Sequence, residues 1–485
     1  MKLNQLLNRN DLPDIEITGI TSDSRAVRKG FLFVAVPGSI QDGRTFIEDA
    51  IRHGAKAILA PTGTTIPRCA QNLDEVIWAE DENPRHALAL AAARFYKIQP
   101  ETIVAVTGTN GKTSTVSFVR QIWEKLNYRA ASLGTLGLQG AGLPNTASMT
   151  TPDPIKLHAQ LAELAQRGVD HLAIEASSHG IDQSRLDAVQ ISAAGFTNIT
   201  HDHLDYHETM ENYVAAKRRL FSYLLKSNGT AVINADSDEY ESIRSICENR
   251  GIRYWSYGYK GQEFKIISRK PKPQGQDLTL EILGQEIEFT LPLVGEFQVM
   301  NMLCAVGLVL ARCEKRLQEI LDILPRLEGV PGRLEFVPGH AKGAGVYVDY
   351  AHTPDALETV LKALRPHTSK MLVCVFGCGG NRDKAKRPVM GRIAAKLADI
   401  AIVTDDNPRN ENAAQIRAEI LQGAPHATEI ADRAEAIRAA INFCKSGDIL
   451  VIAGKGHEQG QIIGDRVEPF DDVTQAHLTM RQEAS

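Results

Sequence analysis

The sequence predicts an α/β protein of three domains, and three observations lead to this prediction. The chain has 485 residues, which corresponds to roughly three domains at about 150 residues each. Its hydrophobic and charged fractions, 43% and 23%, exclude a largely disordered chain. Strand patterns alternate with helical patterns, which favours parallel sheets covered by helices. Pattern changes near Pro100 and Gly332 give expected domains at residues 1–99, 100–331 and 332–485.

The first domain is expected to be a small α/β unit. Residues 30–38 and 55–60 are short apolar runs bounded by turn residues, and they predict strands. Residues 86–96 are rich in Ala and Leu and predict a helix. Pro100 follows this helix and marks a linker.

The second domain is expected to contain a parallel sheet. It opens with a β-branched strand at 102–107, which runs into a glycine-containing loop and a helix reaching about Leu126. The elements expected after these are strands at 171–175 and 191–199, shorter polar strands over 260–288 and a helix over 291–312. Alternation of this kind is typical of a parallel α/β sheet.

The third domain repeats the alternation after residues 328–333 and is expected to be Rossmann-like. Apolar runs predict its four strands, which lie at 346–349, 371–376, 400–404 and 449–453. Helical patterns lie between them, most clearly at 433–444. In such sheets ligands bind beyond the carboxyl ends of the strands.

A phosphate-binding loop is predicted between the strand at 102–107 and the helix after it. The segment is Gly108-Thr109-Asn110-Gly111-Lys112-Thr113, followed by Ser114. Glycines let backbone amides approach phosphate oxygens, and the helix N-terminus adds a partial positive charge. Lys112 would reach the β- and γ-phosphates, and Thr113 would bind Mg²⁺ through its hydroxyl. Val106 stands where the strict motif has glycine, so the loop is a short variant.

Carboxylate and imidazole groups follow two other strands of this domain. Glu175 closes one strand, and His201, His203 and His207 follow the next. A zinc site lacks a completing ligand at a recognisable spacing. Since a phosphate-bearing substrate favours Mg²⁺, we expect Glu175 and one imidazole, that of His203, at the metal.

Composition excludes several classes of function. The formal charge of −5 disfavours binding to the nucleic-acid backbone. No run of 18 apolar residues predicts a membrane span, and the N-terminus has no signal-peptide pattern, so secretion is not expected. The seven cysteines are scattered and odd in number, which fits a reduced, cytoplasmic compartment.

Together these motifs resemble those of the Mur ligase family, the cytoplasmic ATP-dependent amino-acid ligases of peptidoglycan precursor synthesis. The resemblance covers essentially the whole chain. Its motifs occur in the family's order, at residues 108–113, 175–180, 198–207, 213–217, 332–333, 349–354 and 454–458. It implies an N-terminal domain for the uridine end of the substrate, a central P-loop-type ATPase domain and a C-terminal amino-acid domain. It also implies a monomer acting on small molecules.

Within the family, Asp406-Asn407-Pro408-Arg409 resembles the selector of members that add meso-diaminopimelate to UDP-N-acetylmuramoyl-L-alanyl-D-glutamate. Diaminopimelate is lysine with a second carboxylate, and a guanidinium pairs with a carboxylate through two hydrogen bonds. Arg382 and Arg409 would supply this cationic pocket. The resemblance implies that Gly454 and Glu458 hold the ammonium.

The resemblance also assigns the remaining substrate contacts. It implies that Lys217 is carbamylated and bridges to a second Mg²⁺, so that Lys112, Lys217, Glu175 and His203 are the expected catalytic residues. Asn301 would contact adenine, and Arg333 would complete the ATP site. The UDP-muramoyl dipeptide is expected at Ser22, Ser24, Ser39, Ile40, Gln41, Thr150, Thr151, Ser177, Gln183 and Arg185.

The chain departs from the family pattern at Gln298, where Asn or His is common, and at Met149, where relatives often carry Asn. Three alternatives stay open at this stage. They are a lysine-adding ligase of the family, a folylpolyglutamate synthase, which lacks a dedicated uridine domain, and a nucleotide-dependent switch without ligase chemistry. The expected reaction passes through an acyl phosphate of the substrate carboxylate, which the amine of the amino acid then attacks.

Overall fold

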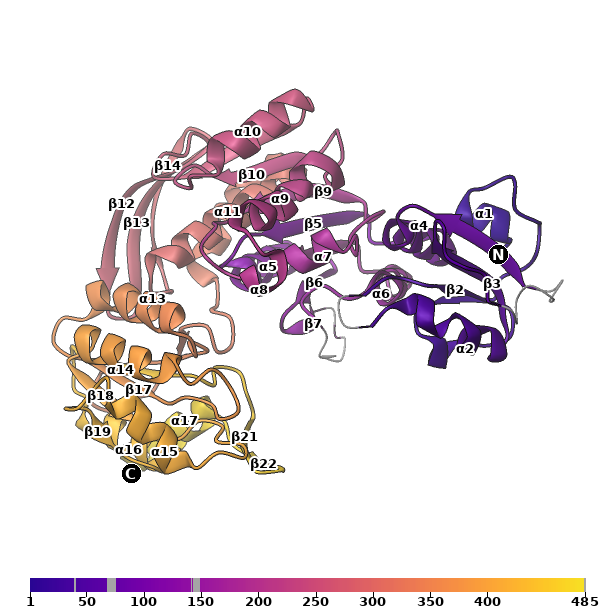
Figure 1. The fold of residues 1–485 in the computed structure, drawn as a ribbon. Coiled ribbons are helices and arrows are strands. Elements are labelled where there is room, and N and C mark those ends of the chain that lie inside the picture. The colour runs from indigo at the N-terminus through magenta and orange to yellow at the C-terminus, as the bar shows by residue number, and fades with distance from the viewer. Residues whose placement is uncertain (39–40, 68–75, 141, 143–148, 484–485) are drawn as a thin grey trace. The chain divides into compact units, whose positions relative to one another are not determined.

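A computed structural model describes residues 1–38, 41–67, 76–140, 142 and 149–483 (Figure 1). The chain forms two compact units. One contains Met1–Ser256 and Cys304–Arg316, and the other contains Tyr257–Leu303 and Leu317–Ser485. The domain boundaries expected at residues 99 and 331 stay a prediction.

The first unit begins with a parallel four-stranded sheet in the order β1-β2-β3-β4. Its strands are β1 Gly19–Thr21, β2 Phe31–Val34, β3 Ala55–Pro61 and β4 Ile77–Asp81, and its helices are α1 Leu3–Leu7, α2 Ile47–Arg52 and α4 Pro84–Tyr96. Successive residues of β2 alternate between two cores: Leu32 packs with residues of α1 and α4, and Phe33 with residues of α2. The predicted strands and helix of this region are confirmed, with shorter strands.

A larger sheet follows in the first unit, with the strand order β10-β9-β5-β8-β6-β7. All neighbouring pairs are parallel except β6 with β7. The strands are β5 Thr102–Thr107, β6 Ala130–Gly134, β7 Gly137–Gly140, β8 His171–Glu175, β9 Ile191–Phe196 and β10 Thr230–Asn234. The carboxyl ends of β5, β8 and β9 adjoin, since Val106 pairs with Glu175 and Thr107 with Phe196.

Helices connect the strands of this sheet. They are α5 Lys112–Lys125, α6 Pro154–Gln166, α7 Ser178–Asp182, α8 Leu204–His207, α9 Met210–Arg219 and α10 Tyr240–Asn249. The chain of α9 continues into one π-helical turn, Leu220–Leu224. Leu220 and Phe221 are fully buried with β9 residues in one core, which fixes the end of α9 against the sheet.

Antiparallel strands and one long helix precede the main sheet of the second unit. β11 Arg253–Gly258 and α11 Glu296–Cys313 are each divided between the two units. β11 ends by pairing in parallel with β12 Phe264–Lys272. β12, β13 Gly275–Ile282 and β14 Gln285–Leu291 form an antiparallel meander. α11 begins later than the predicted helix at 291, because Pro292 and the left-handed Gly295 precede it. The short helix α12 Leu317–Ile323 follows.

The main sheet of the second unit has the order β15-β16-β20-β17-β18-β19 and is parallel except for β15. Its strands are β15 Glu335–Phe336, β16 Gly345–Asp349, β17 Leu372–Phe376, β18 Ile400–Val403, β19 Thr428–Glu429 and β20 Ile449–Ala453. The four predicted strands are confirmed within a residue at either end. A hairpin of β21 Gly460–Ile463 and β22 Arg466–Pro469 follows β20.

Both faces of this sheet are covered by helices, as the prediction of a Rossmann-like layer arrangement requires (Figure 1). The covering helices are α13 Pro354–Leu364, α14 Lys386–Leu397, α15 Ala413–Leu421, α16 Arg433–Phe443 and α17 Asp472–Glu483. Residues of α13, α14 and α15 share a core with Cys374, whereas residues of α16 and α17 share one with Val373. The alternation along β17 therefore separates the two helical layers.

One helical stretch, Glu296–Arg326, is long and apolar enough to cross a membrane by length and composition, and it was not expected from runs of apolar residues. Of its most apolar window, 72% is buried inside the protein. A core helix passes the same test, so this stretch is weak evidence for a membrane span.

Candidate active site

The loop between β5 and α5 has the backbone shape that a phosphate-binding loop requires. Gly108 has a φ of +147°, and a Cβ there would collide with Oγ1 of Thr197. Gly111 caps α5 in a left-handed conformation, which favours glycine. Lys112 and Thr113 then begin the helix, where free backbone N–H groups and the helix dipole favour phosphate.

The end of β9 holds this loop from the side. The Thr197 hydroxyl donates to the Asn110 carbonyl at 2.6 Å, and the Asn110 N–H donates to Oδ1 of Asn198 at 3.0 Å. The predicted strand at 191–199 therefore stops at Phe196, because the next two residues use their polar groups on the loop. Nζ of Lys112 donates to the carbonyls of Gly108, at 3.0 Å, and Thr109, at 2.7 Å.

Lys217 lies beneath the same loop. It comes from α9, its residue is 2% exposed, and its Nζ donates to the Gly108 carbonyl at 2.7 Å. Nζ also lies 4.5 Å from the centroid of the Tyr213 ring. Burial, and then the charge of Lys112, holds the pKa of Lys217 well below its usual range. At a given pH, a larger fraction of Lys217 is therefore in the neutral amine form than of an exposed lysine.

Glu175 is the buried carboxylate of this edge of the sheet. It is 1% exposed, and Thr135 donates to it twice, from the backbone N–H at 2.9 Å and from the hydroxyl at 3.2 Å. His203 differs, because its side chain is 47% exposed and its ring stacks edge-on with His179. Within the described ranges, no group of three or more His, Cys, Asp or Glu side chains is arranged to hold a metal ion.

The residues expected to bind the peptide end form one hydrogen-bonded group next to Glu175. The Thr151 hydroxyl donates to the Glu175 carbonyl at 2.9 Å and lies 3.0 Å from the Ser177 hydroxyl. Arg185 donates to the Thr151 carbonyl at 2.7 Å and to Oε1 of Gln183. Thr150 joins the group through the hydroxyl of Thr135 at 3.1 Å. Burial lowers the pKa of Arg185 from its usual range.

The residues expected at the uridine end follow β1 and β2 along the chain. Ser22 and Ser24 follow β1 and flank Asp23, which caps a short 3₁₀ turn, and Gln41 follows β2. Because β1 and β2 pair in parallel, these residues lie at one edge of the first sheet. Ser39 and Ile40 lie outside the described residues.

Two residues expected at the nucleotide lie in the second unit. Asn301, on α11, is buried, and its amide donates to Oε1 of Gln298 at 3.4 Å, so the departure at Gln298 supports Asn301 directly. The Arg333 guanidinium lies over the Tyr350 ring, 5.0 Å from its centroid.

A cavity of about 630 Å³ in the second unit gathers most residues of the expected diaminopimelate site. Arg382, Asp406, Asn407, Arg409, Gly454 and Glu458 all line it, and Pro408 does not. They come from the loops after β17, β18 and β20, which end at the same edge of the sheet. The wall of the cavity therefore carries both guanidinium groups and carboxylates.

The two loops that carry the arginines are tied together. Arg409 has a φ of +53°, and its guanidinium donates to the Gly380 carbonyl at 2.9 Å. The buried Arg387 pairs with Glu411 at 3.1 Å and Glu419 at 2.7 Å, and it also donates to the Gly379 carbonyl. Hydrogen bonds to Arg387 hold the pKa of Glu411 down, at about 2. The loop positions are thus fixed before a ligand arrives.

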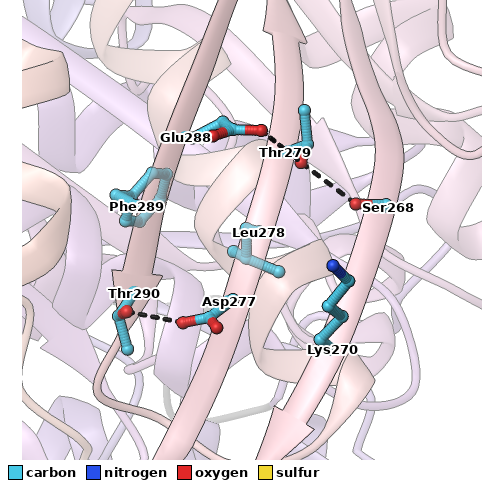
Figure 2. A pocket seen from close by; sticks show the side chains of 8 residues that line it. All are labelled: Ser268, Lys270, Asp277, Leu278, Thr279, Glu288, Phe289 and Thr290. Carbon is cyan, nitrogen blue, oxygen red and sulfur yellow. Dashed lines mark hydrogen bonds between the residues drawn. The ribbon is translucent and has the colours of Figure 1, made fainter.

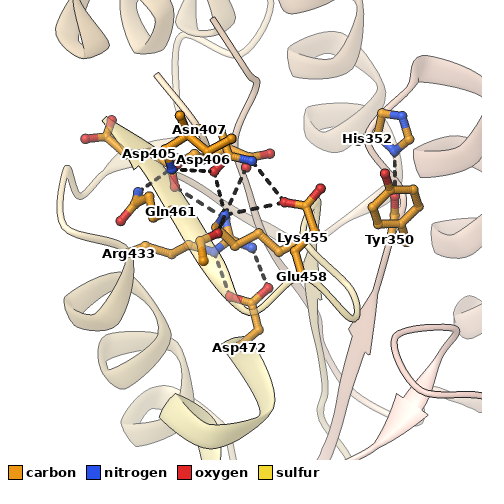
Figure 3. Close-up of polar contacts among 12 residues, drawn as sticks. Tyr350, His352, Asp405, Asp406, Asn407, Arg433, Lys455, Glu458, Gln461 and Asp472 are labelled. Carbon is orange, nitrogen blue, oxygen red and sulfur yellow. Dashed lines mark hydrogen bonds and ion pairs between the residues drawn. The ribbon is translucent and has the colours of Figure 1, made fainter. Parts of the chain in front are cut away.

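Sequence reasoning missed several residues at this cavity. Tyr350, Thr353 and Lys386 line it, and Nζ of Lys386 donates to the His352 carbonyl at 2.8 Å. A further polar network lies beside Asp406 and Asn407, built on Lys455, Arg433 and Asp472 (Figure 3). The motif at 454–458 was a signal for Lys455, but spacing alone does not reveal that its side chain turns inward.

A second hollow, of about 300 Å³, lies on β12, β13 and β14 (Figure 2). Ser268, Thr279 and Glu288 make one cross-strand row of hydrogen bonds over it, and Thr290 donates to Asp277 in the next. Such rows stabilise a sheet face without any ligand. No residue expected at a site lies there.

The fold and the loop between β5 and α5 define an α/β protein of the nucleotide-binding class. The chain belongs to the Mur ligase family. Three family models match it: "Mur ligase family, catalytic domain" at residues 16–96, "Mur ligase middle domain" at 106–309, and "Mur ligase, glutamate ligase domain" at 332–456.

Relatives extend along nearly the whole chain. Two proteins named UDP-N-acetylmuramoyl-L-alanyl-D-glutamate–2,6-diaminopimelate ligase, from Caulobacter vibrioides and Brucella melitensis, are 52% and 48% identical to it. The matches cover 98% of this chain and 97% of the first relative, and 97% and 96% for the second. A solved structure with the same enzyme name is 33% identical, has a TM-score of 0.77, and is matched over 100% of this chain and 99% of its own. The three-domain α/β architecture of the family is thereby confirmed.

Proposed function

We propose that this chain is an ATP-dependent ligase that joins meso-diaminopimelate to UDP-N-acetylmuramoyl-L-alanyl-D-glutamate. The observation that carries the proposal is the cavity in which Arg382 and Arg409 face the same space as Asp406 and Glu458. The named relatives, at up to 52% identity over almost the full chain, support the same substrates.

The cavity suits the chemistry of diaminopimelate. One end of a diamino diacid is a zwitterion, which needs a donor for its carboxylate and an acceptor for its ammonium. The other end has a second carboxylate, for which a guanidinium provides two parallel hydrogen bonds. A lysine side chain would bring an ammonium to that guanidinium, and like charges at close range cost free energy. The arginines therefore favour diaminopimelate over lysine.

The proposed reaction has two steps. The free carboxylate of the D-glutamyl residue attacks the γ-phosphorus of ATP, and an acyl phosphate and ADP form. The neutral amine of diaminopimelate then attacks the acyl carbon, phosphate leaves with the bonding electrons, and the amine loses a proton. Lys112 and the N-terminus of α5 stabilise the charge on the phosphoryl oxygens in the first step.

Mg²⁺ fits the residues at this edge of the sheet. Glu175 is a buried carboxylate, and Thr113 stands in the first turn of α5, so both offer the hard oxygen ligands that Mg²⁺ prefers. When bound, the ion would neutralise charge on the phosphate oxygens. We propose Thr113, Glu175, His203 and the carbamate of Lys217 as the residues that hold Mg²⁺.

The carbamate of Lys217 is a further part of the proposal. Its neutral amine would attack carbon dioxide, form an N–C bond and release one proton. The lowered pKa and the burial of Lys217 support this step, because only the neutral amine is a nucleophile. The product is an anion close to the phosphate loop, where a cation of the substrate complex would balance it.

Lys217→Ala tests the carbamate. We expect loss of activity that short carboxylic acids restore, because they can replace the missing anion, and we expect mass spectrometry under gentle conditions to detect the adduct on the unmodified protein. Lys226→Ala, at a half-buried position that follows the same helical segment, is the control and should be unaffected. Normal activity of Lys217→Ala would contradict the proposal.

A coupled phosphate-release assay tests the function as a whole. Phosphate release should require ATP, the UDP-muramoyl dipeptide and meso-diaminopimelate together. ATP turnover without either organic substrate would instead support a nucleotide-dependent switch. We propose further that the protein acts as a monomer in the cytoplasm, which light scattering and cell fractionation would test. The burial of five of the six described cysteines supports a reduced compartment without disulfides.

A further inference from the structure

We propose that Lys455 is a positioning residue for amino-acid selection: it fixes the amide of Asn407 so that an N–H group, and not the oxygen, faces the pocket. This inference rests on the proposed function, because the pocket is taken to receive the amino acid. Lys455 does not line the cavity, so its effect would pass through Asn407.

The oxygen side of the Asn407 amide is fully used. Nζ of Lys455 donates to Oδ1 of Asn407 at 2.8 Å, and the backbone N–H of Ile462 donates to the same oxygen at 3.0 Å (Figure 3). Both partners are donors, so only an oxygen can occupy this position. The hydrogen bonds therefore determine which way the amide points.

The amide nitrogen of Asn407 keeps one hydrogen that can bind a ligand in the pocket. Nδ2 of Asn407 donates one hydrogen to Oε2 of Glu458 at 2.9 Å. A primary amide nitrogen has a second hydrogen, and Asn407 lines the cavity. In this orientation Asn407 can bind a carboxylate of the ligand while it also holds Glu458, which can accept from the ligand's ammonium.

Lys455 is itself held in place. Its side chain is fully buried, and Nζ donates to the Gly460 carbonyl at 2.7 Å as well as to Asn407. Asp406 and Glu458 place carboxylate oxygens 3.6 and 3.7 Å from Nζ. Burial lowers the pKa of Lys455, and the charge of Asp406 opposes this shift. The lysine is thus a fixed donor rather than a mobile surface cation.

The carboxylates around Lys455 outnumber the cationic side chains there by one. Lys455 and Arg433 face three carboxylates, those of Asp406, Glu458 and Asp472. Arg433 and Asp472 neutralise each other through two hydrogen bonds of 2.7 Å, so the excess carboxylate lies on the cavity side. An incoming ammonium would balance it.

The strand β21 completes the support of the selector. Gln461 donates to the Asp406 carbonyl at 2.7 Å, and the Arg409 N–H donates to the Ile462 carbonyl at 3.0 Å. The backbone from Asp406 to Arg409 is therefore held against β21. Removing Lys455 would leave the Ile462 N–H as the remaining donor to the Asn407 oxygen, and it would loosen this side chain without releasing the loop. The effect of Lys455 on the Asn407 side chain can therefore be measured apart from any effect on the loop backbone.

Lys455→Met keeps most of the side-chain volume and removes the donor. We expect the KM for meso-diaminopimelate to rise about tenfold, the change that the loss of one charged hydrogen bond produces. The KM for ATP and for the UDP-muramoyl dipeptide should stay within about twofold of the unmodified protein. Lys445→Met, on the exposed surface of the same unit, is the matched control and should change none of these constants.

A double-mutant cycle separates positioning from simple loss of structure. Lys455→Met should add almost nothing to the KM defect of Asn407→Ala, because the amide that it orients is already absent. Full additivity of the two effects, or an unchanged KM for diaminopimelate in Lys455→Met, would overturn the inference.

Asn407→Asp provides a second test that does not depend on the folding of Lys455→Met. The new carboxylate keeps an acceptor for Lys455 but offers neither Glu458 nor the pocket a donor, so the KM for diaminopimelate should rise in a protein that circular dichroism shows to be folded. Unchanged diaminopimelate binding would overturn the inference. If the unmodified protein does not use diaminopimelate at all, the proposed function fails as well, which distinguishes the two failures.

Discussion

At the scale of single residues, the proposed function assigns to Arg409 the discrimination at the far end of the amino acid. Its left-handed backbone and its hydrogen bond to the Gly380 carbonyl fix the guanidinium at the wall of the cavity. One nitrogen is engaged with the protein, and the planar group has further donors for a carboxylate. A lysine at this position would supply only a point charge.

Arg409→Lys should therefore lower kcat/KM for diaminopimelate by about 10- to 100-fold, since hydrogen bonds to charged groups contribute about 1.5–3 kcal/mol. Steady-state kinetics with varied diaminopimelate measure this loss. Arg438→Lys, in an exposed pair with Glu435, is the matched control. Equal losses in both variants would contradict the role of Arg409.

Asp349 gives a prediction about pH. Burial raises its pKa from 3.8 to about 6, although the charge of Arg333 and N–H donors from Leu334 and Ala351 oppose the shift. Between these two pH values the folded chain binds more protons than the unfolded chain, so this residue's contribution to stability falls as pH rises.

Asp349→Asn removes that titration. The free energy of unfolding of the unmodified protein, minus that of the variant, should decrease between pH 3.8 and about 6 and level off above. Urea unfolding at a series of pH values measures this difference. A difference that is constant or rises over the window would show that Asp349 does not titrate as described.

Sequence reasoning predicted the charged residues on the cavity wall better than the residues behind them. Arg382, Arg409 and Glu458 were predicted because their charges match the substrate and their motifs are recognisable. Lys455 stood inside one of those motifs but was left without a role, because a lysine is usually solvated and sequence does not show its burial.

At the scale of elements, the start of α16 is fastened to the start of α17. Arg433 and Asp472 are both fully buried and pair at 2.7 Å, and Arg433 also donates to the Ala453 carbonyl at the end of β20. This pair ties two helices to the strand end from which Gly454 and Lys455 extend. The position of this pair therefore helps to fix the backbone at Gly454 and Lys455.

Asp472→Ala should lower the free energy of unfolding of this unit by about 3–5 kcal/mol, because it leaves a buried, uncompensated guanidinium. Glu435→Ala removes an exposed partner of Arg438 on α16 and should cost no more than about 0.5 kcal/mol. Urea denaturation monitored by circular dichroism compares the two. Similar small effects would contradict a structural role for the buried pair.

Elements were predicted well where apolar runs are long, and less well where side chains compete with the strand. β5, β8 and β20 are fully buried and appear where strands were predicted. β9 ends at Phe196, short of the predicted Ile199, because Thr197 and Asn198 bind the phosphate loop. Strand propensity does not include such hydrogen bonds between a strand end and a distant loop.

At the scale of the whole molecule, length predicted three domains, and the family models match three successive regions. The charge of −5 is a poor guide to the proposed ligands, because the groups expected to bind anionic substrates are local ones such as Lys112, Arg185 and Arg409. The loop expected to bind phosphate and the cavity at Arg382 and Arg409 follow strands of different sheets.

The most direct test of the proposed function is a competition. The protein is supplied with ATP, the UDP-muramoyl dipeptide and equal concentrations of meso-diaminopimelate and L-lysine, and the tripeptide product is identified by mass spectrometry. The cavity with Arg382 and Arg409 predicts the diaminopimelate product almost alone. Lysine incorporated equally or preferentially would contradict it.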